Sequence, residues 1–166
     1  VSHHRAHALA GLAPHLYAEQ LQEVLRTTQS IEDSSSRAHI LACLAPHLSA
    51  EQLQEALHTA QGIEDWHSRA HALAGLAPQL STGEQEQVLQ EALRTIQGIE
   101  ESSSRAEALA GLAPQLSAGQ LQEALHTAQD IEDSVFRARA LAGLAPHLTA
   151  EQLQEALHTA QGIEDW

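Results

Sequence analysis

Histidine and cysteine side chains are the groups in this chain that could do the most chemistry. The sequence holds 12 His and a single cysteine, Cys43. His39, Cys43 and His47 follow one another at intervals of four residues, so on a helix they would share one face. Imidazole and thiolate bind zinc or copper, and Cys43 beside His47 could instead form a nucleophile–base pair. The pattern therefore raises two chemical alternatives, a metal site and a cysteine nucleophile.

Each alternative lacks parts that its chemistry needs. A structural zinc site takes four converging ligands, and Pro46 is expected to end the helix before His47. The nucleophile pair has no third group to orient it and no donors for an oxyanion. Solvated surface histidines, with Cys43 in a place that glycine holds elsewhere, account for the same residues. We therefore predict a non-enzymatic protein with no catalytic residues, no metal site and no cofactor, and keep a His/Cys metal-binding protein as a minor alternative.

The elements that carry these residues form a repeat. A segment of the type Arg-Ala-x-Ala-Leu-Ala-Gly-Leu-Ala-Pro begins, with small changes, at intervals of 32, 32, 36 and 32 residues, at Arg5, Arg37, Arg69, Arg105 and Arg137. Each is followed by a second block, typified by residues 49–61. A period near 32 with two blocks is typical of helical-hairpin solenoids. We predict one repeat domain over residues 1–166, with repeats 1–36, 37–68, 69–104, 105–136 and 137–166.

Both blocks have the pattern of amphipathic helices. Positions within a repeat are counted from its arginine, which is position 1. In the first block leucines at positions 5, 8 and 12 fall on one stripe, with small alanines beside them. In the second block the apolar residues fall at positions 17, 20, 21, 24 and 27. The fold class predicted is all-α, an α-solenoid of five tandem helix-turn-helix repeats of about 32 residues.

Local signals set the expected helix ends in the second repeat. Asp33 or Ser34 can cap the first helix, and Pro46 should end it. Ser49 should cap the second helix, with Gln52 completing a capping box, and Gly62 should terminate it. The third repeat carries four extra residues within positions 81–87. Four residues turn a helix by about 400°, so we expect a helix one turn longer with its phase preserved.

The first block also predicts a candidate binding surface. Positions 3, 7 and 11 lie opposite the leucine stripe, and we call these residues the first-helix face. A peptide could bind there in a shallow groove with a glycine floor and polar ridges; alternatively, glycine only clears space for the neighbouring helix. The residues of the first-helix face are His7, Gly11, His15, His39, Cys43, His47, His71, Gly75, Gln79, Glu107, Gly111, Gln115, Arg139, Gly143 and His147.

The two-block unit, with motifs such as the Arg-Ala-Arg-Ala-Leu-Ala-Gly-Leu-Ala-Pro of residues 137–146, resembles bacterial α-solenoid helical-hairpin repeats of the tetratricopeptide and HEAT-like groups. The resemblance covers essentially the whole chain. It implies a protein- or peptide-binding scaffold, of the kind found as a segment of larger bacterial signalling or sensor proteins. A purely structural spacer is the second hypothesis. Pentatricopeptide repeats are of similar length and bind RNA, but the charge of this chain argues against them.

That charge is strongly negative. Asp and Glu number 22 against 8 basic residues, which gives a net charge of −14. Such a surface repels nucleic acid and anionic membranes, so neither is an expected partner. A single cysteine closes no intrachain disulfide, and no apolar run approaches the roughly 20 residues of a spanning helix, so we expect a cytoplasmic protein. The first residue is Val, and both terminal repeats lack a capping unit. We therefore expect a piece of a longer chain, or end-to-end self-association of the exposed terminal repeats.

Overall fold

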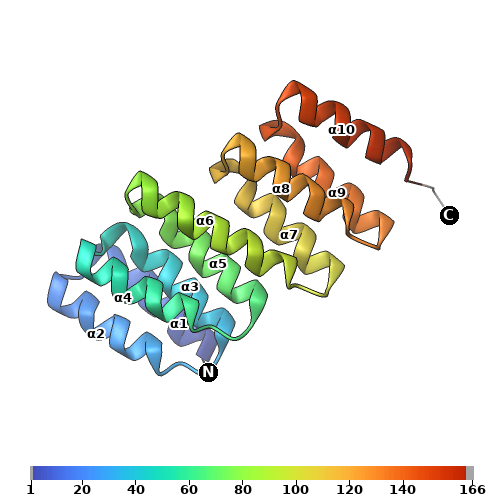
Figure 1. Ribbon diagram of the computed structural model, residues 1–166. Coiled ribbons are helices and arrows are strands. Elements are labelled where there is room, and N and C mark those ends of the chain that lie inside the picture. Colours follow the sequence, from blue (N-terminus) through green and yellow to red (C-terminus); the bar gives the residue numbers. More distant parts are fainter. Residues whose placement is uncertain (1, 164–166) are drawn as a thin grey trace. The chain divides into compact units, whose positions relative to one another are not determined.

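The computed structural model describes residues 2–163, with side chains described from His4 onward (Figure 1). The described part is all-α, with no strand, as the sequence pattern predicts. Five short 3-10 turns follow the odd-numbered helices, and none of the described helices has the length and apolar character needed to cross a membrane. The helices are α1 (Ser2–Leu12), α2 (Ala18–Gln29), α3 (Ser34–Leu44), α4 (Ala50–Gln61), α5 (Trp66–Leu76), α6 (Thr82–Gln97), α7 (Ser102–Leu112), α8 (Ala118–Gln129), α9 (Ser134–Leu144) and α10 (Ala150–Gln161).

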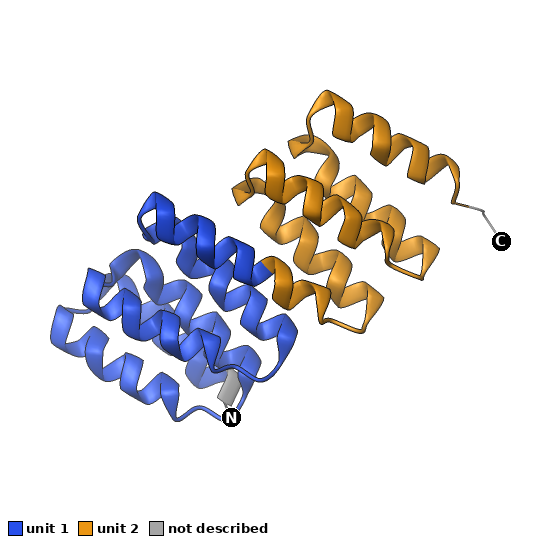
Figure 2. Cartoon of the chain, viewed as in Figure 1, with its two compact units in different colours: residues 1–92 blue, residues 93–166 orange. Residues whose placement is uncertain are grey.

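The chain divides into two compact units, residues 1–92 and 93–166, with the boundary inside α6 (Figure 2). In the first unit α3 packs between α1 and α5, and α2 and α4 lie beside each other against this row. In the second unit α7 packs against α9, and α8 lies beside α10. The predicted starts of the second to fifth repeats, at residues 37, 69, 105 and 137, each fall three residues inside a helix. Within a unit, each even-numbered helix also packs against the first helix of the next repeat.

The helix starts follow the predicted local signals. Asp33 accepts a hydrogen bond from the Ser36 backbone N–H at 2.7 Å and so caps α3. Ser49 and Gln52 form a reciprocal capping box at the start of α4, with each side chain bonded to the other residue's backbone N–H. Both devices satisfy amide groups that have no partner within the helix. The N-terminal capping predictions are confirmed at these residues.

The proline acts differently from the prediction. The α-helical part of α3 ends at Leu44, but Ala45, directly before Pro46, keeps helical angles with φ −45° and ψ −47°. The chain continues as a 3-10 turn over Ala45–His47 and becomes extended only at Leu48. Proline fits the first positions of such a turn because the N–H that it lacks has no partner there. The α-helix therefore ends before Pro46 as predicted, but Ala45 does not leave helical geometry, so that part of the expectation is wrong.

The helix ends also differ from the glycine cap that was predicted. Gly62 has φ −80° and ψ 0°, and Ser30 and Asp130 take nearly the same angles at the equivalent places. Because no residue in the described part has a positive φ, the left-handed conformation that favours glycine is not used. Glycine, serine and aspartate therefore hold this position in the same conformation.

Instead, an arginine that recurs in successive repeats donates a hydrogen bond to the backbone just after each of these helix ends. The Nε of Arg37 donates to the carbonyl oxygen of Ile31 at 2.9 Å, and the Nε of Arg69 donates to Ile63 at 2.6 Å. Arg105 and Arg137 make the same contact with Ile99 and Ile131. A guanidinium supplies charged donors to a carbonyl at the negative end of a helix. The residue that opens one repeat therefore closes the helix of the repeat before it.

The predicted apolar stripes form the core. Leu41, Leu44 and Ile63 are fully buried, as is Ala56. The four extra residues of the third repeat lengthen α6 to 16 residues, against 12 in α4. Its apolar residues remain buried on one side, so the phase is preserved as expected; they are Val88, Leu89, Ala92, Leu93 and Ile96.

Candidate functional site

In the first unit, the first-helix face is rich in histidine. His7 and His71 are exposed and His39 is half-buried, all at position 3 of their repeats. Position 11, in the 3-10 turns, carries exposed His15, His47 and Gln79. Because α3 packs between α1 and α5, these side chains belong to one row of adjacent helices. The structure thus places the predicted polar residues of this unit on its surface.

The glycines of this face have two different surroundings. A Cβ added to Gly75 would lie 2.5 Å from the Cβ of Ala42, and one added to Gly143 would lie 2.6 Å from the Cβ of Ala110. Real Cβ atoms do not approach so closely, so α5 and α9 pack against α3 and α7 in a way that only glycine permits. A Cβ at Gly11 would meet no atom within 4 Å. Close helix packing, the second of the two sequence interpretations, accounts for Gly75 and Gly143.

Cys43 takes the glycine position in α3 and is half-buried. Its Sγ lies 3.8 Å from the Nε2 of His39, which is on the preceding turn. Burial raises the pKa of the Cys43 thiol, which disfavours the thiolate that a nucleophile or metal ligand would need. His47 belongs to the 3-10 turn and not to the helix of Cys43. Among the described residues, no three His, Cys, Asp or Glu side chains are grouped so that they could hold a metal ion.

In the second unit the same positions carry other chemistry. Glu107 and Arg139 are exposed at position 3 of α7 and α9. At position 11 Gln115 is half-buried and His147 is exposed. The repeat frame is therefore constant, while its outward residues change from histidine to an acid and a base.

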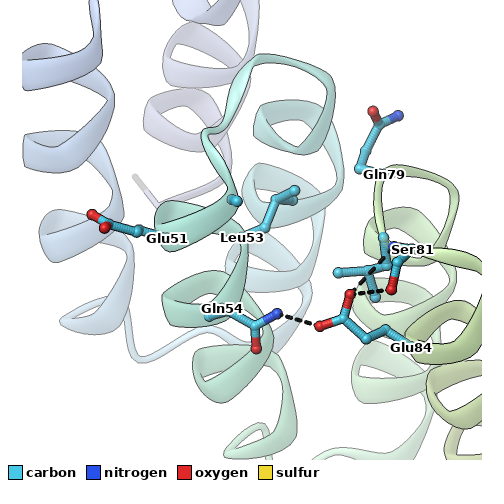
Figure 3. A pocket seen from close by; sticks show the side chains of 8 residues that line it. Glu51, Leu53, Gln54, Gln79, Ser81 and Glu84 are labelled. Atoms are coloured by element: carbon cyan, nitrogen blue, oxygen red, sulfur yellow. Dashed lines mark hydrogen bonds between the residues drawn. The ribbon is translucent and has the colours of Figure 1, made fainter.

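A pocket that the sequence analysis did not predict lies in the first unit, between α4 and the start of α6 (Figure 3). Its volume is about 410 Å³. Inside it, the Nε2 of Gln54 donates to an Oε1 of Glu84 at 2.9 Å, and Ser81 donates to the same carboxylate from its hydroxyl and its backbone N–H. The pKa of Glu84 is lowered, first by the Ser81 hydroxyl and then by these other donors. The lining residues are Ala50, Glu51, Leu53, Gln54, Gln79, Leu80, Ser81 and Glu84.

The residue at the capping position of α6 accounts for the pocket. In the second and fifth repeats the capping glutamine also donates its Nε2 to the preceding repeat, from Gln52 to the carbonyl of Ala18 at 2.9 Å and from Gln152 to that of Ala118 at 2.8 Å. The third repeat has Glu84 at this place, and a carboxylate cannot donate. The equivalent carbonyl belongs to Ala50, which lines the pocket. The glutamate within the four-residue insertion was the sequence signal that could have revealed it.

Two glutamine side chains of one even-numbered helix also donate hydrogen bonds to a glutamate of the next even-numbered helix. Gln22 and Gln29 of α2 donate to the two carboxylate oxygens of Glu55, at 2.5 and 2.9 Å. Gln122 and Gln129 of α8 grip Glu155 in the same way, at 2.8 and 3.0 Å. The bond from Gln122, followed by that from Gln129, lowers the pKa of Glu155. We call this arrangement the glutamine clamp; sequence reasoning missed it because its partners are up to 33 residues apart.

Comparison of the chain with models of protein families, with curated proteins and with solved structures finds no match.

Proposed function

We propose that this chain is a non-enzymatic helical-repeat scaffold, an α-solenoid of tetratricopeptide-like or HEAT-like hairpins, that binds an extended protein segment. The binding surface is the first-helix face. The support comes from the contrast between two sets of positions in the same helices. Leu41, Leu44 and their equivalents in the third to fifth repeats are buried and do not vary, whereas the residues at positions 3 and 11 lie at the surface and vary between repeats.

This contrast is the observation that carries the proposal. A frame held by buried residues can change its outward residues at little cost in stability, so variation there alters what the surface recognises. In the first unit the row offers imidazoles, which donate or accept hydrogen bonds and stack on planar groups. His7, His39 and His71 are the residues expected to contact the partner first. Close packing at Gly75 keeps adjacent helices near enough for one extended segment to touch both.

Selection from a random 12-residue peptide library, followed by affinity measurement with the recovered peptides, tests the proposal. We expect the combined His7→Ala, His39→Ala and His71→Ala variant to weaken binding at least tenfold, about 1.4 kcal/mol. The matched control replaces three exposed residues away from this face, Arg26, His58 and Glu32, with alanine and should bind as the unaltered chain does.

The same measurement separates a binding scaffold from a structural spacer. A spacer would yield no peptide above background, or only peptides whose affinity is equal for both triple variants. Either result would contradict the proposal. Helical content measured by circular dichroism shows that each variant is folded before its affinity is compared.

A further inference from the structure

At the pocket between α4 and the start of α6, the third repeat lacks a contact that the second repeat makes. The capping glutamine Gln52 bonds in two directions: its Oε1 accepts from the Ser49 backbone N–H at 3.0 Å, and its Nε2 donates to the Ala18 carbonyl at 2.9 Å. Glu84 can only accept, because an ionised carboxylate has no donor. The equivalent carbonyl, that of Ala50, receives no side-chain donor from any residue that the structure describes. It lines the pocket together with Glu84, so both groups border a space that a glutamine fills elsewhere.

The hydrogen bonds of Glu84 hold its carboxylate at this space. Ser81 donates to the Oε2 from its hydroxyl and its backbone N–H, and the Nε2 of Gln54 donates to the Oε1 at 2.9 Å (Figure 3). These donors are neutral groups, so they orient the carboxylate without cancelling its charge. A carboxylate also has room for about four hydrogen bonds, so it can accept a further donor from a bound molecule.

The rest of the lining is apolar or uncharged apart from Glu51. Leu53 is buried and Leu80 is half-buried, and Figure 3 shows the Leu53 side chain directed toward the segment that carries Ser81. None of the eight lining residues is Lys, Arg or His. The pocket therefore offers a carboxylate, a backbone carbonyl and an apolar surface, and it lies in a chain with a net charge of −14. A ligand with hydrogen-bond donors, a positive charge and an apolar stem matches these groups.

A metal ion matches them less well. Calcium takes six to eight oxygen ligands, and magnesium requires a near-octahedral set. The carboxylate of Glu51 points away from that of Glu84 (Figure 3), which leaves one carboxylate in the pocket. Among the described residues, no group of three His, Cys, Asp or Glu side chains could hold a metal ion. An organic cation needs fewer protein ligands, because its own N–H groups are directional donors.

We propose that this pocket binds the guanidinium group of an arginine side chain from a protein partner. The planar guanidinium donates to the Glu84 carboxylate and the Ala50 carbonyl together. Its methylene stem lies against Leu53 and Leu80. A lysine ammonium has the charge but not the planar set of donors. This site goes beyond the function proposed above, since Gln79 is its only residue that belongs to the first-helix face.

The lining also favours an arginine within a polypeptide over the free amino acid. Free arginine carries an α-carboxylate, and the pocket has no basic residue to receive it. The acidic chain repels that group, whereas the neutral amides that replace it in a polypeptide are not repelled. The same negative charge attracts basic segments of a partner over roughly a Debye length, about 8 Å at physiological ionic strength. We therefore expect the affinity to fall as salt is added.

An NMR chemical-shift titration of the isotope-labelled chain with N-acetyl-arginine-methylamide tests the proposal. Saturating shifts should occur at the backbone amide of Ser81 and the side-chain amide of Gln54, which adjoin the carboxylate. The neutral isostere N-acetyl-citrulline-methylamide should give no saturating shift at the same ionic strength. The lysine analogue and free arginine should each bind more weakly than the arginine probe.

Glu84→Gln should weaken binding of the probe by about fivefold or more, since it removes the charge and supplies an Nε2 that can donate to Ala50 itself. The variant should fold, because Glu84 is exposed and Gln52 holds the same capping place. Glu19→Gln is the matched control: it removes one exposed carboxylate outside the pocket and should bind as the unaltered chain does.

Several results would overturn the proposal. They are the lack of a saturating shift at millimolar probe, equal binding of the citrulline analogue, and equal affinity of the Glu84→Gln and Glu19→Gln variants. Tighter binding of free arginine than of the probe would overturn the assignment to a protein partner. Replacement of the three histidines His7, His39 and His71 by alanine should leave the titration unchanged, so this proposal and the peptide-binding function fail separately.

Discussion

At the scale of single residues, the same Ala-Gly-Leu sequence occurs in two environments. The backbone of α5 meets Ala42 at Gly75, and the equivalent glycine of α1, Gly11, meets nothing within 4 Å. Glycine inside a helix costs about 1 kcal/mol relative to alanine, so its presence needs a compensating reason. At Gly75 the reason is the close approach of α5 to α3, which leaves no room for a side chain. This reason does not exist in the surroundings of Gly11.

These environments predict opposite effects of one substitution. Gly75→Ala must push α5 away from α3, and overpacking of this kind costs about 1–3 kcal/mol, more than the gain in helix propensity. Gly11→Ala keeps the gain of about 1 kcal/mol and meets no obstacle. We expect the melting temperature to fall for Gly75→Ala and to rise for Gly11→Ala, as followed by circular dichroism. Equal shifts for both variants would show that the contact with Ala42 is not a constraint.

Residues that act on their own neighbourhood could be predicted from the sequence, and residues that act on another repeat could not. Asp33 and Ser49 cap helices with amides three residues away, so their pattern is visible in the sequence. Gln52 looks like an ordinary capping residue, yet its Nε2 reaches Ala18, 34 positions earlier. Arg37 has a nearby acid in Asp33, but its guanidinium donates to the Ile31 carbonyl. Such choices depend on where the neighbouring backbone lies.

At the scale of helices, the number and order of the helices could be predicted from the periodicity of the sequence. Leucine and alanine every three to four residues form a single apolar stripe when the segment is helical, and that stripe can then be buried. The ends were less predictable. Proline continued the chain as a 3-10 turn, and Gly62 kept an ordinary helical conformation. The pocket beside α6 was missed because its origin is a change from donor to acceptor in one capping residue, Glu84.

The long helix α6 allows a test of phase. Deletion of residues 84–87 together with Val88→Gln removes one turn and restores the regular repeat with a glutamine in the capping place. We expect a folded protein whose melting temperature is equal or higher, and slower hydrogen exchange at the start of α4, where the pocket closes. Deletion of residues 84–85 alone is the control. It rotates the rest of the helix by about 200°, so Leu89 and Leu93 would face solvent and the third repeat should unfold.

The two deletions must differ for the interpretation of the insertion to hold. If both variants fold equally well, burial of the apolar residues of α6 does not depend on the phase of this helix. If both unfold, the extra turn itself is needed for stability, and the view of it as an addition to a regular repeat is wrong. Hydrogen exchange resolved by residue separates loss of the third repeat from loss of the whole fold.

At the scale of the molecule, a charged side chain of the repeated unit occurs several times. The charges of equivalent residues therefore sum to a large net charge. The chain carries −14 with its histidines neutral, and it contains 12 of them. The isoelectric point expected from the sequence is about 5.1, so acidification from pH 7 to pH 5 brings the net charge from −14 close to zero. Mutual repulsion between copies scales with the square of the net charge, so it is largely lost over this range.

We therefore expect light scattering from a concentrated solution to rise steeply as the pH falls from 7 to 5 and to fall again when the pH is restored. Scattering that stays flat across the range would show that net charge does not control association of this chain.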